Sequence, residues 1–178
     1  MKQNRENPFF ETYRTPFGTP PFDQIETEQY EPAFDEGIRQ LDEEVRAIAD
    51  NTELPTFENT IIALERSGKL LDKVISAFFN VLNAEADDEM MDISQRVSPK
   101  LSESSNNIYL NEQLFARVKS VYDRKDELHL PMEDARLLEK TFEAFCARGA
   151  ALGPEEKEKY RKLSSELSFF PSHSIRTH

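Results

Sequence analysis

The sequence predicts an all-α fold, an antiparallel bundle of about six helices. Only five of the 178 residues are Gly, and the apolar residues recur at steps of three and four positions instead of alternating with polar ones. Hydrophobic residues make up 38% and charged residues 31% of the chain, which is typical of a highly charged helical protein. A chain of this length is expected to form one domain.

Residues 1–26 are predicted to form an extended arm. They hold four of the ten prolines, which remove backbone donors and disfavour a helix. They also hold four phenylalanines, too many for an ordinary disordered tail. We expect these rings to pack on the chain's own domain or on a partner. The phenylalanines are Phe9, Phe10, Phe17 and Phe22.

Two long helices are predicted over the next 60 residues. In residues 27–50 the apolar positions follow steps of 4, 4, 3, 4 and 3: Tyr30, Phe34, Ile38, Leu41, Val45 and Ile48. A second helix is expected over 57–82, with Thr56 as its N-cap. Gly68 interrupts this helix, which indicates a close contact with another helix there, with a hinge as the alternative.

Four further helices complete the predicted bundle, with short connections that favour antiparallel neighbours. The first spans 87–106, begins at a capping acid and should be kinked or divided at Pro99. Residues 111–124 follow, capped by Asn111. The next helix covers 131–148, with Pro131 at its first position and Gly149 as its stop. The last begins at Gly153 and carries Tyr160, Leu163 and Leu167.

Charge and composition exclude several classes of function. The net charge of −12 argues against nucleic-acid binding, which requires a basic face. No segment approaches the length of an apolar membrane span, and the first residues lack the apolar run of a signal peptide. We therefore expect a cytoplasmic protein. Cys146 is the only cysteine and is interpreted as a small buried helix residue.

No residue is predicted to be catalytic, to bind a cofactor or to ligate a metal. A zinc peptidase helix needs His-Glu-x-x-His, and none of the three histidines is followed by Glu. His129 is interpreted as a loop or cap residue, and His173 and His178 stand in a segment without helical pattern. Neither a Gly-x-Ser-x-Gly motif nor a glycine-rich phosphate loop occurs.

Four segments are more specific than amphipathic helix patterns. They are NPFFETYRTPFGTPPFDQIETEQYEPAFDEGI at 7–38, PTFENTIIALERSGKLLDKVISAFFN at 55–80, VSPKLSESSNNIYLNEQLFARVKSVYD at 97–123 and LEKTFEAFCARGAALGPEEKEKYRKLSSELS at 138–168. Together they resemble the peptidyl-dipeptidase branch of the thimet oligopeptidase-like zinc metallopeptidases. The resemblance covers nearly all of residues 7–168.

The resemblance implies a large, two-lobed helical enzyme that removes dipeptides from the C-terminus of short peptides. Its zinc helix and its acidic third ligand would lie far beyond the matched region, so no catalytic residue transfers to this sequence. The matched region resembles the N-terminal helical part of one lobe. The resemblance thus implies a non-catalytic segment, whose partner is the missing C-terminal catalytic region and whose zinc and peptide substrates belong to the full-length enzyme.

The family pattern ends at about Ser168. All 34 acidic residues precede this point, and the last ten residues, FFPSHSIRTH, include none. We expect a truncation there, by a frameshift or a shortened gene, and disorder over 169–178. The predicted organisation is therefore an arm at 1–26, a helical domain at 27–168 and a tail at 169–178.

A missing lobe would leave apolar surface exposed. The predicted sites are the phenylalanines of the arm and the pair Phe78 and Phe79. A marginal fold or self-association would follow, because about 400 Å² of uncovered apolar surface forgoes on the order of 10 kcal/mol. The alternative interpretation is a helical module without enzymatic activity that binds peptides or another subunit.

Overall fold

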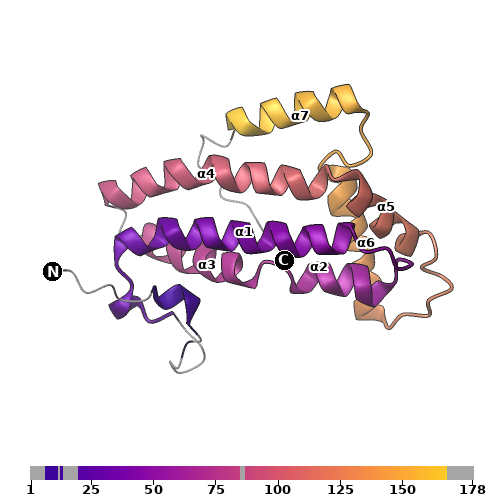
Figure 1. The fold of residues 1–178 in the computed structure, drawn as a ribbon, viewed down its shortest axis with the longest axis horizontal. Helices are drawn as coiled ribbons and strands as arrows, with labels where there is room; N and C mark the ends of the chain where they lie inside the picture. Colours follow the sequence, from indigo (N-terminus) through magenta and orange to yellow (C-terminus); the bar gives the residue numbers. More distant parts are fainter. Residues whose placement is uncertain (1–6, 12, 14–19, 85–86, 168–178) are drawn as a thin grey trace. The chain divides into compact units, whose positions relative to one another are not determined.

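A computed structural model describes residues 7–11, 13, 20–84 and 87–167 (Figure 1). No β-strand occurs in these ranges, which confirms the all-α prediction. The helices are α1 (Tyr30–Ala49), α2 (Ala63–Arg66), α3 (Lys69–Ala84), α4 (Asp88–Tyr109), α5 (Glu112–Tyr122), α6 (Met132–Ala147) and α7 (Pro154–Leu167). None of them is long and apolar enough to cross a membrane.

The chain forms two compact units. Unit 1 comprises Met1–Leu41 and Gly68–Val97, and unit 2 comprises Asp42–Ser67 and Ser98–His178. Helices α1 and α4 therefore contribute residues to both units. The predicted tail at 169–178, with His173 and His178, lies outside the described residues, as does Phe17 of the arm.

Unit 1 is built around a ladder of aromatic rings. Phe78 of α3 makes edge-to-face contacts with Tyr30 and Phe34 of α1, at centroid distances of 5.3 and 5.2 Å. Phe9 of the arm extends the ladder, 5.3 Å from Tyr30. Such pairs add stability beyond the area that they bury. The prediction of exposure is therefore wrong for Phe9 and Phe78, which are buried, but right for Phe10, Phe22 and Phe79, which are exposed.

The predicted helix over 57–82 is not continuous. Residues Phe57–Ile62 form a π-helical turn, and α2 ends before Gly68, whose φ is +75°. This left-handed conformation favours glycine and ends a helix. The predicted close contact at Gly68 is confirmed, because a Cβ placed there would lie 3.1 Å from Cδ1 of Leu41.

Helices α1 and α3 approach each other closely at Gly37. A Cβ on this residue would lie 3.0 Å from the Cα of Leu71, so only glycine lets the backbone come this near. Gly37 faces Leu71, and Leu41, further along α1, faces Gly68, which precedes Leu71. The two helices therefore run antiparallel, as predicted.

In unit 2, helices α5 and α6 pair through stacked aromatic rings. Tyr122 and Phe142 lie 3.9 Å apart with an interplanar angle of 8°, and Phe115 stacks on Phe145 at 6.1 Å. Tyr122, at the end of α5, contacts an earlier residue of α6 than Phe115 does, near the start of α5, so the two helices run antiparallel. Gly149, with φ +87°, follows the C-cap of α6 and is the predicted stop.

The predicted helix caps are found at three helix starts. Thr56 Oγ1 accepts a hydrogen bond from the Asn59 amide, and Asn111 Oδ1 accepts one from Leu114. Asp87 does the same for Met90 at the start of α4. Each acceptor satisfies a backbone amide that has no partner within its helix. Helix α4 continues through Pro99. The alternative prediction that Pro99 divides this helix is therefore wrong, and only a kink is compatible with it.

Candidate functional site

Unit 1 contains a broad groove with a volume of about 1410 Å³. The arm, α1, α3 and the first half of α4 form its walls. Its apolar lining includes Phe9, Phe10 and Ile93. Most of the lining is charged: Glu11, Glu28, Glu31, Asp35, Glu36, Arg39, Lys69, Lys73, Glu89 and Arg96. The groove therefore offers binding groups of both signs, with carboxylates in the majority.

The arm forms one wall because Lys73 of α3 holds its backbone. Lys73 Nζ donates hydrogen bonds to the carbonyl oxygens of Phe9 and Glu11, at 3.0 and 2.7 Å. The same amine lies 3.5 Å from the centroid of the Tyr13 ring, a cation–π contact. Burial lowers the pKa of Lys73. Burial, and secondarily Tyr30, raises the pKa of Tyr13 to about 12, so its ring stays neutral beside the amine.

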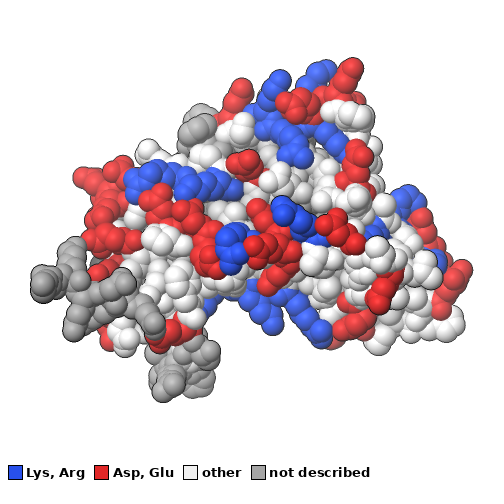
Figure 2. Space-filling model, viewed as in Figure 1, with Lys and Arg blue, Asp and Glu red and all other residues white. Residues whose placement is uncertain are grey.

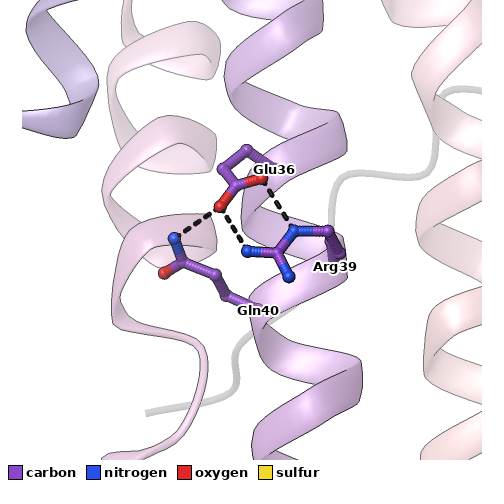
Figure 3. A network of polar contacts seen from close by, with 3 residues as sticks. All are labelled: Glu36, Arg39 and Gln40. Atoms are coloured by element: carbon purple, nitrogen blue, oxygen red, sulfur yellow. Dashed lines mark hydrogen bonds and ion pairs between the residues drawn. The ribbon is translucent and has the colours of Figure 1, made fainter.

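A polar network on α1 lines the same groove (Figure 3). Glu36 accepts hydrogen bonds from Arg39 Nε and Nη2 at 2.9 and 2.7 Å, and from Gln40 Nε2 at 2.8 Å. The hydrogen bonds from Arg39, followed by the one from Gln40, lower the pKa of Glu36 to about 2. One helical turn separates these residues, which is why their side chains meet. Glu36 therefore stays ionised over the physiological pH range.

An ion pair between α1 and α4 completes the groove wall. Arg96 Nε lies 3.0 Å from Glu31 Oε2. The described residues that line the groove include no His, Cys, Ser or Thr. The groove is suited to binding a polar or charged ligand through ion pairs and hydrogen bonds. More widely, acidic and basic side chains are interspersed over the face in Figure 2.

Unit 2 has a second polar centre around Arg117 of α5, which is only 7% exposed. Its Nη1 donates to the carbonyl oxygens of Asn51 and Glu53, at 2.6 and 2.9 Å. Its Nη2 donates to Asn59 Oδ1 at 3.0 Å, the oxygen that also caps the π-helical turn. The sequence analysis did not single out Arg117. A signal was present in the sequence, because Arg117 is the one charged residue among the apolar positions of α5 that face inward.

The residues considered for chemistry in the sequence are dispersed in the structure. His129 lies in the turn before α6, with φ +48° and its Nδ1 3.0 Å from the Asp126 carbonyl oxygen, consistent with a loop role. Cys146 is exposed on α6, so its interpretation as a buried residue is wrong. It lies one position beyond Phe145, the buried residue of that turn, and helical geometry directs it away from the core.

The described part of the chain contains no set of side chains that could ligate the zinc ion implied by the resemblance. No group of three or more His, Cys, Asp or Glu side chains is placed there to hold a metal ion. Two carboxylates of the groove pair with cations, Glu36 with Arg39 and Glu31 with Arg96. No chemical step is therefore assigned to a metal within these residues.

Comparison with known proteins reveals close relatives, although no family model matches the chain. The chain is 43% identical to a dipeptidyl carboxypeptidase of Escherichia coli over 93% of its own length and 24% of that relative. It is 40% identical to a dipeptidyl carboxypeptidase of Salmonella typhimurium, over 90% of the chain and 24% of the relative. Oligopeptidase A of Escherichia coli is 23% identical over 86% of the chain and 23% of the relative.

These alignments confirm the resemblance seen in the four sequence segments. They cover nearly the whole chain at high identity in the first two cases, and the lower identity with oligopeptidase A marks a more distant relationship. The chain is therefore similar to the dipeptidyl carboxypeptidases and, more distantly, to oligopeptidase A, and it spans about a quarter of the length of these relatives.

Proposed function

We propose that the chain is the N-terminal helical part of a cytoplasmic zinc peptidyl-dipeptidase, and that it is inactive on its own. The observation that carries this proposal is the 43% identity to a dipeptidyl carboxypeptidase over 93% of the chain. The zinc site and the catalytic residues would lie in the three quarters of such an enzyme that this sequence does not match. The partner of the chain would be that catalytic region.

Within such an enzyme, this segment would bind and confine peptides instead of cleaving them. The groove of unit 1 supports this role, because its charged lining can pair with the termini and side chains of a short peptide. Two rigid features hold its walls in place, the arm on Lys73 and the Glu36 network on α1. A groove with fixed walls loses less entropy when it binds a ligand.

The test compares the chain alone with a fusion in which it replaces the matching quarter of the Escherichia coli dipeptidyl carboxypeptidase. We expect the chain alone to bind no stoichiometric zinc, measured by elemental analysis, and to release no dipeptide from an N-terminally blocked tetrapeptide. The fusion should bind zinc and release the C-terminal dipeptide in a chelator-sensitive reaction. Chelator-sensitive release by the chain alone, or an inactive but folded fusion, would contradict the proposal.

The groove also favours a second candidate function, a peptide-binding module without enzymatic activity. In that case the chain alone should bind a fluorescent peptide, and a cationic peptide should bind more tightly than an anionic one because carboxylates predominate in the lining. The variant Glu31→Gln should weaken binding of the cationic peptide, whereas Glu133→Gln on α6 in unit 2 is the matched control. Equal binding of both peptides, or none, would reject this candidate.

A further inference from the structure

Helix α7 exposes the apolar residues that should anchor it. Leu163 and Leu167 lie one turn apart on this helix and are 59% and 64% exposed. Helical spacing places them on the same stripe of the helix surface. No residue of α7 is buried. The leucine pair, which we call the α7 stripe, is thus left open by the described part of unit 2.

Helix α7 is attached to the rest of unit 2 by polar groups. The Ser164 carbonyl oxygen accepts a hydrogen bond from Ser102 Oγ at 3.3 Å, and Ser164 Oγ accepts one from Asn106 Nδ2 at 2.7 Å. Arg161 Nη1 donates to Asn107 Oδ1 at 3.1 Å. All three partners belong to the second half of α4, beside which α7 lies in Figure 1.

This arrangement is the reverse of an ordinary amphipathic helix. Isolated helices of this length are marginal in water, and most of their stability in proteins comes from packing an apolar face. Here the serine and arginine face is engaged and the leucine stripe is open. The stripe differs from single exposed residues such as Leu54, which lies in a loop, and Met132, which is the first residue of α6, although these are 82% and 85% exposed.

We propose that the α7 stripe is the surface on which the rest of the peptidase polypeptide docks, through an apolar face of its own. The chain spans about a quarter of the relatives' length, so most of such a protein lies outside this sequence. Helix α7 is the last helix of the described residues. This inference rests on the function proposed above.

Cysteine accessibility tests the proposal directly. In a Cys146→Ala background, Leu163→Cys and Leu167→Cys are labelled with a maleimide, in the 178-residue chain and in the fusion described above. We expect fast labelling in the chain and labelling at least about tenfold slower in the fusion, because a packed side chain reacts only after local opening. The controls Leu54→Cys and Met132→Cys, in the same unit, should react at the same rate in both.

Each other outcome overturns the proposal. Fast labelling of both stripe cysteines in the fusion means that no polypeptide covers them. Equal protection of the two controls means that the stripe has no special role. Protection in the 178-residue chain that grows with protein concentration assigns the stripe to a second copy of the chain instead.

The failure of this inference and that of the proposed function are distinguishable. A fusion that releases dipeptides but labels quickly at positions 163 and 167 rejects docking alone. A folded fusion that protects both cysteines but releases no dipeptide rejects the proposed function alone. If the fusion does not fold, the cysteines are placed at the aligned positions of the Escherichia coli relative itself, and the same tenfold criterion applies there.

Discussion

The arm of unit 1 and the loop over residues 50–56 of unit 2 are both irregular segments whose carbonyl oxygens accept hydrogen bonds from cationic side chains. Lys73 donates to two carbonyl oxygens of the arm, and Arg117 donates to two carbonyl oxygens of the loop. The arm also inserts Phe9 into an aromatic core, whereas Leu54 of the loop is 82% exposed. The arm thus has an apolar anchor, whereas the loop is held by hydrogen bonds, from Arg117 and also from Arg124, which donates to the Pro55 carbonyl oxygen.

The two cations also differ in their surroundings. Arg117 is buried and has a planar head that serves four acceptors at once: the two loop carbonyls, Asn59 Oδ1 and Thr60 Oγ1. Lys73 is half-buried and holds a point charge over Tyr13. A guanidinium keeps its charge when buried, whereas burial lowers the pKa of a lysine, as it does for Lys73. The more buried cation is expected to contribute more to stability.

The largest expected effect is at the apolar anchor of the arm. Phe9→Ala removes a ring that is buried against Tyr30 and should lower the free energy of unfolding by about 3 kcal/mol. Urea unfolding followed by circular dichroism measures this loss. The neighbouring Phe10→Ala is the control, because Phe10 is half exposed and its loss should change stability by less than about 0.5 kcal/mol. Equal losses of stability in the two variants would refute the proposal that Phe9 anchors the arm.

The next effect is at the cation of the loop. Arg117→Leu leaves the loop carbonyls and Asn59 Oδ1 without their donor and should destabilise the chain by about 2 kcal/mol. Hydrogen exchange of the π-helical turn Phe57–Ile62 should rise with it, since Asn59 Oδ1 loses the additional donor that ties the turn to α5. Arg117→Lys keeps the charge but not the fork of donors, and we expect it to recover less than half of the loss. Full recovery would show that charge alone holds the loop.

A smaller effect is expected at the cation of the arm. Lys73→Met keeps the apolar stem and removes the amine, so only hydrogen bonds and the cation–π contact are lost. The cost should be about 1 kcal/mol. Lys69→Met, another groove lysine on α3, serves as the control and should be close to neutral. If Lys73→Met costs as much as Phe9→Ala, the distinction between the two anchors fails.

The smallest effect on stability is expected at Glu36, where the stability depends on the protonation of the carboxyl group. Hydrogen bonds from Arg39 and Gln40 hold its pKa at about 2, against an ordinary value of 4.5. A lowered pKa stabilises the folded state above the unfolded value, and the stabilisation is lost as pH falls from about 4.5 to about 2. NMR titration of the carboxyl carbon measures this, and Arg39→Gln should raise the pKa of Glu36. An unchanged titration in that variant would assign the shift to another cause.

The sequence predicted the helices well because their signals are local. Periodic apolar positions marked α1, and Asn111 and Gly149 marked one helix start and one helix stop. At Gly68 the sequence predicts a close contact, with a hinge as the alternative, but not the end of a helix, since a glycine within a periodic pattern does not reveal its φ. The positive φ became visible only in the structure.

The candidate groove could not be predicted because its walls come from distant parts of the chain. Lys73 meets the carbonyl of Phe9 across 64 positions of sequence, and Arg117 meets that of Asn51 across 66. No local pattern shows which lysine will find a carbonyl oxygen or which arginine will be buried. Burial of Phe78 and exposure of Cys146 were misjudged for the same reason.

By itself, the sequence determined the helical class, most helix boundaries and the relationship to dipeptidyl carboxypeptidases, because periodicity, capping and residue identity are properties of neighbouring positions. Only the tertiary structure decided which rings are buried, which cations hold the arm and the loop, and which face of α7 stays open. These outcomes depend on which surfaces meet. A pairing between residues 60 positions apart is set by the packing of whole helices.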